Sequence, residues 1–144
     1  MNEALLDANA LIAAHDESHA DHRRTRRFVD GLKKFYTCPQ TEGAFLRFFT
    51  RPWRDADGRE QPPRLTTAEA MENLTAICRL KEHDFLADDF SFSKVSMRSL
   101  SGFKQWNDAY LIAKANRAGL PLATLERKLE NMDHLARPVI FRIL

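Results

Sequence analysis

Near its start the chain contains Leu5-Leu6-Asp7-Ala8-Asn9-Ala10-Leu11-Ile12, an apolar segment that runs into an acid and then into a helical pattern. Consecutive apolar residues are typical of a strand that is buried on both faces, as in a parallel sheet. The carboxylate of Asp7 is therefore expected at the carboxyl end of a strand over residues 3–7. In open α/β sheets this is the edge where ligands bind.

The same alternation of strand and helix continues along the chain. Further short strands are predicted at 35–38, 85–86, 120–124 and 139–144. Helices are predicted at 9–15, 19–33, 41–51, 67–81 and 107–118. Strands that alternate with helices imply right-handed crossovers and a parallel sheet covered on both sides. The sequence thus predicts an α/β fold of three layers, α/β/α, around a central, mostly parallel sheet. Residues 52–66 contain three prolines and are predicted to form the only long loop.

Length and composition indicate one globular domain over residues 1–144. The chain is 44% hydrophobic and 29% charged, and no apolar run approaches the roughly 20 residues that a membrane helix needs. No signal peptide is visible, and Cys38 and Cys78 lack metal-ligand spacing. These features predict a cytoplasmic protein without a membrane segment, whose thiols are reduced.

The charge balance is compatible with a polyanionic partner. The chain has 22 Lys and Arg against 20 Asp and Glu. If four of these acids gather in one site, the remaining surface is basic, as suits a nucleic acid held beside an acidic pocket. An ordinary solvated surface explains most of these charges equally well.

Four acids stand where predicted strands end or helices begin: Asp7, Glu42, Asp108 and Glu126. Each one has a structural explanation when taken singly. An acid in the first helical turn interacts favourably with the helix dipole, by about 0.3–1 kcal/mol, and Thr41 and Asn107 are candidate helix caps.

Taken together, the four acids predict a metal site. The carboxyl ends of parallel strands share one edge of the sheet, so the four side chains can converge there. Carboxylates that converge repel one another unless cations neutralise them, and Mg²⁺ or Mn²⁺ prefers oxygen ligands. Such ions catalyse in-line displacement at phosphorus. The sequence has no glycine-rich phosphate loop, no HExxH motif and no strand–turn nucleophile with a matching base.

Four segments resemble, in order and spacing, the motifs of PIN-domain ribonucleases, and most closely those of the VapC toxins of bacterial type II toxin–antitoxin systems. These are LLDANALIA at 5–13, TEGAFLR at 41–47, NDAYLIA at 107–113 and LATLER at 122–127. The resemblance implies a PIN fold and Mg²⁺- or Mn²⁺-dependent endonucleolytic cleavage of RNA. It also implies a homodimer and neutralisation by a cognate VapB-like antitoxin.

The resemblance also assigns residues. Asp7, Glu42 and Asp108 match the acidic metal-binding positions, and Asn9 and Thr124 match polar positions near the site. Glu126 stands where the family more often has Asp, and its side chain is one methylene longer. Glu126 can still bind a metal ion, but the difference in reach leaves the number of ions open.

Other groups have two interpretations each. Residues that could contact RNA, or simply face solvent or a partner, are the basic residues Arg23, Arg24, Arg26, Arg27 and Arg47, together with Arg51, Arg54, Arg59 and the aromatic Trp53 around the 52–66 loop. Three neighbouring histidines, His15, His19 and His22, are predicted to be surface residues rather than a zinc site.

Two alternatives to a toxin remain at this stage. The first is a PIN nuclease of another kind, which processes RNA or acts on structured DNA ends. The second is a catalytically idle module that binds RNA or a partner protein. Metal-dependent cleavage separates the nucleases from the idle module, and growth arrest on expression separates a toxin from a processing enzyme.

Overall fold

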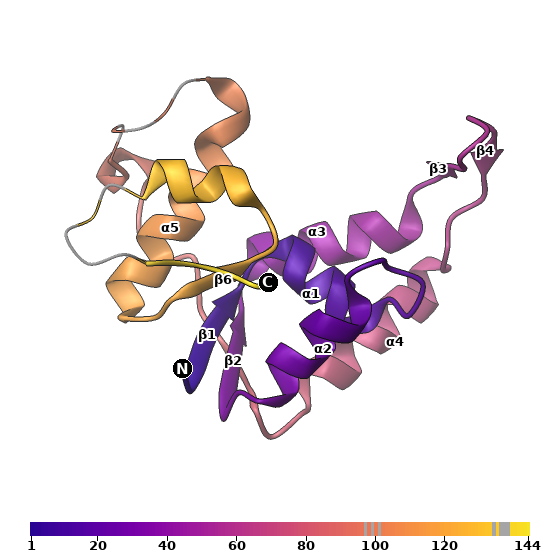
Figure 1. The fold of residues 1–144 in the computed structure, drawn as a ribbon, viewed down its shortest axis with the longest axis horizontal. Helices are drawn as coiled ribbons and strands as arrows, with labels where there is room; N and C mark the ends of the chain where they lie inside the picture. Colours follow the sequence, from indigo (N-terminus) through magenta and orange to yellow (C-terminus); the bar gives the residue numbers. More distant parts are fainter. Residues whose placement is uncertain (97, 99, 101, 134, 136–138) are drawn as a thin grey trace.

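A computed structural model of the chain describes residues 1–96, 98, 100, 102–133, 135 and 139–144. Its centre is a five-stranded sheet with the order β5-β2-β1-β6-β7 (Figure 1). The strands are β1 Glu3–Leu6, β2 Lys34–Thr37, β5 His83–Phe85, β6 Leu122–Thr124 and β7 Ile140–Arg142. Every pair in this sheet is parallel. The predicted α/β fold with a mostly parallel sheet is therefore confirmed.

Helices cover both faces of the sheet. The α-helices are α1 Ala8–His15, α2 His22–Asp30, α3 Pro39–Thr50, α4 Thr67–Cys78 and α5 Trp106–Ala118. Short 3₁₀ turns are η1 Phe92–Lys94, η2 Phe103–Gln105 and η3 Arg127–Met132. Side chains of α1 to α4 share one hydrophobic cluster, and those of α5 and η3 share a second one on the opposite face. The sheet therefore lies between two layers of helices, with one hydrophobic cluster on each of its faces.

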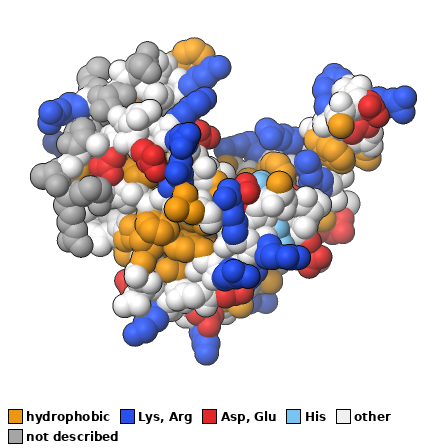
Figure 2. All heavy atoms as spheres, in the orientation of Figure 1, with side chains coloured by type: hydrophobic (Ala, Val, Ile, Leu, Met, Phe, Trp, Pro, Cys, Tyr) orange, Lys and Arg blue, Asp and Glu red, His pale blue; other side chains and the backbone are white. Residues whose placement is uncertain are grey.

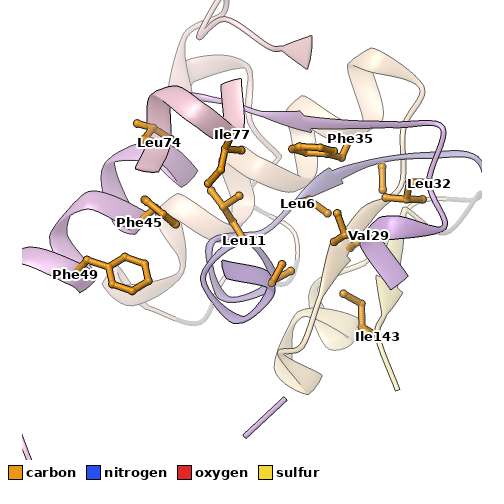
Figure 3. Close-up of a cluster of buried hydrophobic side chains, with 14 of the residues drawn as sticks. Leu6, Leu11, Val29, Leu32, Phe35, Phe45, Phe49, Leu74, Ile77 and Ile143 are labelled. Carbon is orange, nitrogen blue, oxygen red and sulfur yellow. The ribbon is translucent and has the colours of Figure 1, made fainter. Parts of the chain in front are cut away.

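Strand β1 explains why the first apolar run is continuous. Ala4 and Leu6 point into the cluster under α1 to α4, whereas Leu5 points into the cluster under α5. All three are 0% exposed. Figure 3 shows the first cluster, with Leu6 of the sheet beside Leu11 of α1. Because β1 is covered on both faces, it holds the residue that follows it in a fixed position.

The predicted helix ends differ from the observed ones where side chains have other partners. Helix α3 begins at Pro39, with Cys38 as its cap, and Thr41 is the third residue of the helix rather than its cap. Helix α5 begins at Trp106, so Asn107 is also inside the helix. Helix α2 begins at His22 and not at residue 19. Gly119 ends α5 with φ 68°, in the left-handed conformation that favours glycine.

The predicted loop at 52–66 contains a small antiparallel hairpin, β3 Trp53–Arg54 and β4 Glu60–Gln61. Figure 1 shows this hairpin projecting from the body of the molecule beyond the end of α3. At its base the Arg64 guanidinium lies 4.5 Å from the Phe48 ring centroid and 4.4 Å from that of Trp53. This stacking ties the hairpin to α3.

Among the helices that the structure describes, none combines the length and the apolar character needed to cross a membrane.

Candidate metal centre at the carboxyl edge of the sheet

Asp7 lies at the junction of β1 and α1, and its side chain is only 7% exposed. The carboxylate accepts a hydrogen bond from the backbone N–H of Ala8 at 2.7 Å. It also accepts one from the hydroxyl of Thr124 at 2.8 Å. Burial raises the pKa of Asp7, and the nearby charge of Glu126 raises it further. At the end of β1, the two hydrogen bonds to Asp7 therefore offset only part of the cost of burying its negative charge.

Asp108 comes to the same edge from the other layer, in the first turn of α5. Partial burial, followed by the charges of Asp7 and Glu126, raises the pKa of Asp108 from 3.8 to about 6. The charge contribution to this shift indicates that Asp7 and Glu126 lie near Asp108.

Glu126 completes the trio from the segment after β6. It is exposed, it caps η3, and its carboxylate accepts a hydrogen bond from the backbone N–H of Lys128 at 3.5 Å. Its charge raises the pKa of both Asp7 and Asp108. The structure therefore brings together Asp7, Asp108 and Glu126, which are three of the four acids selected from the sequence.

Glu42 has different neighbours. It lies half-buried in the first turn of α3, and its carboxylate accepts a hydrogen bond from the Thr37 hydroxyl at 2.6 Å. The same oxygen lies 4.0 Å from the sulfur of Cys78. The charges that raise the pKa of Asp7 and Asp108 are those of Asp7 and Glu126, and Glu42 is not among them. Glu42 stands at the same edge of the sheet, and in this structure its carboxylate is turned toward α4 and β5.

A hydrogen-bond network joins the ends of β1 and β6. The Thr124 hydroxyl, which is fully buried, donates to Asp7 and accepts from the Asn9 side-chain amide at 3.2 Å and from the backbone N–H of Glu126 at 2.9 Å. The Asn9 carbonyl oxygen accepts from the backbone N–H of Leu125 at 3.0 Å. Asn9 and Thr124 therefore position two of the acids.

This network predicts that Thr124→Val lowers the RNA cleavage expected from the sequence by roughly 10–100-fold, the usual cost of losing a group that orients a metal ligand. The change keeps the volume of the side chain but removes the hydroxyl that donates to Asp7. RNA cleavage by the purified variant measures the effect, and circular dichroism checks the fold. Thr25→Val is the matched control, because the buried Thr25 hydroxyl has no hydrogen-bond partner in the described part of the chain. Full activity of Thr124→Val would show that the network plays no part in the site.

A cleft of about 500 Å³ opens beside the acids. Among the residues that line it are Asn9, Phe103, Lys104, Asp108, Glu126 and Lys128. Figure 2 shows the molecule hollowed between the part that carries α5 and η3 and the projecting β3–β4 hairpin, with Lys and Arg side chains on both sides of the hollow. The acids thus lie beside a cleft that also contains basic groups.

The residues at this edge fit a divalent cation. The donors at this edge are carboxylate oxygens; burial is the main cause of the raised pKa of Asp108, and the charges of Asp7 and Glu126 add to it. Oxygen donors with excess negative charge suit the hard ions Mg²⁺ and Mn²⁺.

Some residues that line the cleft were not identified as candidates from the sequence. Phe103 is 80% exposed and lines the cleft together with Lys104 and Lys128. Phe103 and Lys104 belong to the 3₁₀ turn η2, which is too short to leave a periodic pattern. Their position just before Asn107 and Asp108 was the only signal available.

Several of the other basic and histidine candidates have local partners. On α2, Arg24 pairs with Asp21 at 2.7 Å and Arg26 pairs with Asp30 at 2.6 Å. His15 and His22 contact the backbone oxygens of Leu11 and Ala13 at 2.9 Å and 2.7 Å. Within the described ranges, Glu42, Cys78 and His83 are the one group of three His, Cys, Asp or Glu side chains whose ligand atoms lie within 4.8 Å of one another. Cys78 and His83 were not candidates from the sequence.

Comparison with known proteins identifies the family. The family described as "PIN domain" matches residues 4–135. Ribonuclease VapC38 of Mycobacterium tuberculosis is 35% identical over 125 residues, which cover 85% of this chain and 84% of the relative. Ribonuclease VapC29 of the same species is 32% identical over 129 residues, 89% of each chain. The solved structure of VapC20 of M. tuberculosis, titled a sarcin–ricin loop cleaving toxin, aligns with a TM-score of 0.61 over 94% of this chain and 98% of its own, at 12% identity.

The fold, the order of the motifs and these relatives agree with the resemblance seen in the sequence. The chain belongs to the PIN-domain family and, within that family, to the VapC ribonucleases.

Proposed function

We propose that this protein is a metal-dependent endoribonuclease that acts as the toxin of a VapBC-type toxin–antitoxin system. The observation that carries the proposal is the convergence of Asp7, Asp108 and Glu126 beside a cleft with Lys104 and Lys128. Acids alone repel RNA, and basic groups alone bind it without cutting. Their combination is what hydrolysis of a phosphodiester requires.

Asp7 and Asp108 are the principal ligands of Mg²⁺ or Mn²⁺ in this proposal, and Glu126 and Glu42 complete the site. Bound divalent ions supply Lewis-acid stabilisation of the phosphate oxygens and activation of the attacking water. Thr124 and Asn9 hold the Asp7 carboxylate in one orientation. Burial of Asp7 and partial burial of Asp108 strengthen the attraction between these acids and a cation.

The cleft residues bind RNA. Lys104 and Lys128 contribute charge that holds phosphates without reading sequence. The exposed ring of Phe103 offers a face on which an unpaired base stacks. The proposed substrate is therefore RNA with unpaired bases near the cleavage site.

Removal of divalent metal is expected to abolish cleavage. The purified protein should cut total RNA in the presence of Mg²⁺ or Mn²⁺, stop in excess EDTA, and recover when either ion is restored, because the carboxylate oxygens need these ions for catalysis. Gel analysis of RNA measures the result. Cleavage that persists in EDTA contradicts the proposal, and RNA binding without any cleavage favours the idle binding module.

The proposed partners follow from the same family assignment. They are an RNA substrate, a cognate VapB-like antitoxin and a second copy of the chain in a homodimer, all in the cytoplasm. One PIN domain over residues 1–144 performs the reaction in this proposal. The relatives named VapC support the RNA and antitoxin assignments.

The toxin role predicts that expression of the protein arrests bacterial growth, because cleavage of an essential RNA stops protein synthesis. Co-expression of the antitoxin encoded beside it should restore growth. Optical density after induction measures both effects, with an Asp7→Asn variant as the inactive control. Unchanged growth together with metal-dependent cleavage in vitro favours a processing nuclease instead.

A further inference from the structure

Glu42, Cys78 and His83 form a corner at the side of the site, where α3, α4 and β5 meet. Glu42 is in the first turn of α3, Cys78 is the last residue of α4, and His83 is the first residue of β5. One ligand atom from each of the three lies within 4.8 Å of the others. Glu42 is 36 residues from Cys78 in sequence, so it is the fold that brings it to Cys78 and His83.

The geometry points to a Zn²⁺ site at this corner, formed by the Glu42 carboxylate, the Cys78 thiolate and the His83 imidazole. In tetrahedral zinc sites the bond lengths place neighbouring ligand atoms about 3.4–3.7 Å apart. The Cys78 sulfur and the Glu42 oxygen are already at 4.0 Å. Small rotations of the three side chains close the remaining distance. A water molecule or the Thr37 hydroxyl can take the fourth position.

The chemistry of the ligands favours zinc over the ions proposed for the trio. A thiolate and an imidazole suit Zn²⁺, whereas Mg²⁺ and Mn²⁺ prefer oxygen. All three side chains are half-buried, so an ion can reach them from solvent and is then partly shielded from water. The two candidate metal centres therefore differ in donor set, and each selects its own ion.

The hydrogen bonds of Thr37 leave room for a cation. The Thr37 hydroxyl is 2.6 Å from the Glu42 carboxylate and 2.7 Å from Nε2 of His83. A hydroxyl has one proton, so it can donate to only one of two acceptors. When the carboxylate is ionised and the neutral imidazole has its proton on Nδ1, one of the two acceptors keeps a lone pair. A bound metal ion uses that lone pair.

The histidine ring is also held in place by its surroundings. The ring of His83 hydrogen-bonds the backbone of Cys78, and it packs edge-on against the Phe35 ring, with centroids 5.4 Å apart. A second hydrogen bond of this kind commonly orients the imidazole of a metal-binding histidine. The ring therefore loses little freedom when it binds an ion.

Zinc at this corner has a consequence for the nuclease, and this part rests on the proposed function. Glu42 is shared between the two centres. Zn²⁺ bound by Cys78 and His83 holds Glu42 in the direction observed in this structure, away from Asp7 and Asp108. We therefore expect zinc to inhibit the cleavage that Mg²⁺ or Mn²⁺ supports.

Titration with Co²⁺ tests the site without any need for activity. Co²⁺ replaces Zn²⁺ in such sites, and a cobalt–thiolate bond produces a charge-transfer absorption. The full-length protein in a non-thiol reductant should bind one equivalent of Co²⁺ with this absorption, and Zn²⁺ should displace it. Cys78→Ser and His83→Gln should each weaken this binding at least tenfold. Cys38→Ser, which changes the other cysteine, and Asp7→Asn, which disables the proposed nuclease site, should both keep it.

The outcomes separate the two proposals. Absence of the absorption in wild type, or its persistence in Cys78→Ser, overturns the zinc site. In a parallel cleavage assay, low micromolar Zn²⁺ should reduce Mg²⁺-supported cutting at least tenfold in wild type and leave Cys78→Ser unaffected. Equal inhibition of both proteins overturns the inhibitory role. If wild type cuts no RNA under any condition, the proposed function fails, and the cobalt titration still decides the site.

Discussion

Asp108→Asn is expected to abolish RNA cleavage, with a loss of roughly 1,000-fold or more in rate, equal to about 4 kcal/mol of transition-state stabilisation. The amide keeps the shape of the carboxylate but removes the charge that holds the metal ion. A fluorescent RNA substrate with saturating Mg²⁺ measures the loss. Asp89→Asn, a change of the same type at an exposed acid, should retain full activity. Cleavage by Asp108→Asn at more than a tenth of the wild-type rate would falsify the assigned site.

The same variant should be more stable than wild type when metal is absent, which separates a lost ligand from a damaged fold. The pKa of Asp108 is about 6 in the folded protein against 3.8 ordinarily, so the unfolded chain ionises more readily. Ionisation therefore destabilises the fold at pH values above 6, and the penalty disappears as the pH falls toward 4. We expect Asp108→Asn to gain about 1–2 kcal/mol in free energy of unfolding at pH 7.5, and little at pH 4. Urea unfolding in EDTA at the two pH values measures the difference. A gain of the same size at both contradicts this account.

Phe45→Ala is expected to cost about 3–5 kcal/mol of stability, because it leaves a cavity in the core. Phe45 is 0% exposed and packs against Phe49, with ring centroids 4.8 Å apart, in the cluster of Figure 3. It lies one turn after Glu42 on α3, so the loss also loosens the helix that positions this acid. Thermal and urea unfolding measure the effect.

The matched control for Phe45→Ala is Phe103→Ala, which truncates an aromatic ring that is 80% exposed. Its stability should change by less than about 0.5 kcal/mol. Its affinity for single-stranded RNA should fall by about 1–3 kcal/mol if the ring stacks on a base. Equal stability losses in the two variants would contradict the burial described for Phe45.

The parts of the site that could be predicted are those with local signals. The apolar run before Asp7 indicates a buried strand, and a buried parallel strand leaves the next residue at the ligand-binding edge. Asp108 lies near the start of a periodic helix that ends at Gly119, so its place was also readable from the sequence. The structure brings these two acids together with Glu126.

The direction of Glu42 could not be predicted, because it depends on residues that only the fold brings near. Its hydrogen bond comes from Thr37 in β2, and its other neighbours, Cys78 and His83, lie across the turn between α4 and β5. The sequence places Glu42 at the correct edge but contains no information about which neighbour attracts its carboxylate.

Helix boundaries were misplaced where a side chain has another partner. The second helix was predicted to begin at residue 19, but the Ser18 hydroxyl just before it donates to Asp16 at 2.7 Å, and α2 starts only at His22. The hairpin at 52–66 was missed because its strands have two residues each. Two residues are too few to produce the alternation by which strands are detected.

The hydrogen bond between Thr124 and Asp7 joins residues 117 positions apart, which has a consequence for the time at which the enzyme becomes active. During synthesis at about 5–20 residues per second, some 6–23 s pass between the two residues. Until β6 docks beside β1, Asp7 has neither this hydroxyl nor the charge of Glu126 near it. A nascent chain therefore cannot complete this edge of the sheet until Thr124 and Glu126 have been synthesised and β6 has paired with β1.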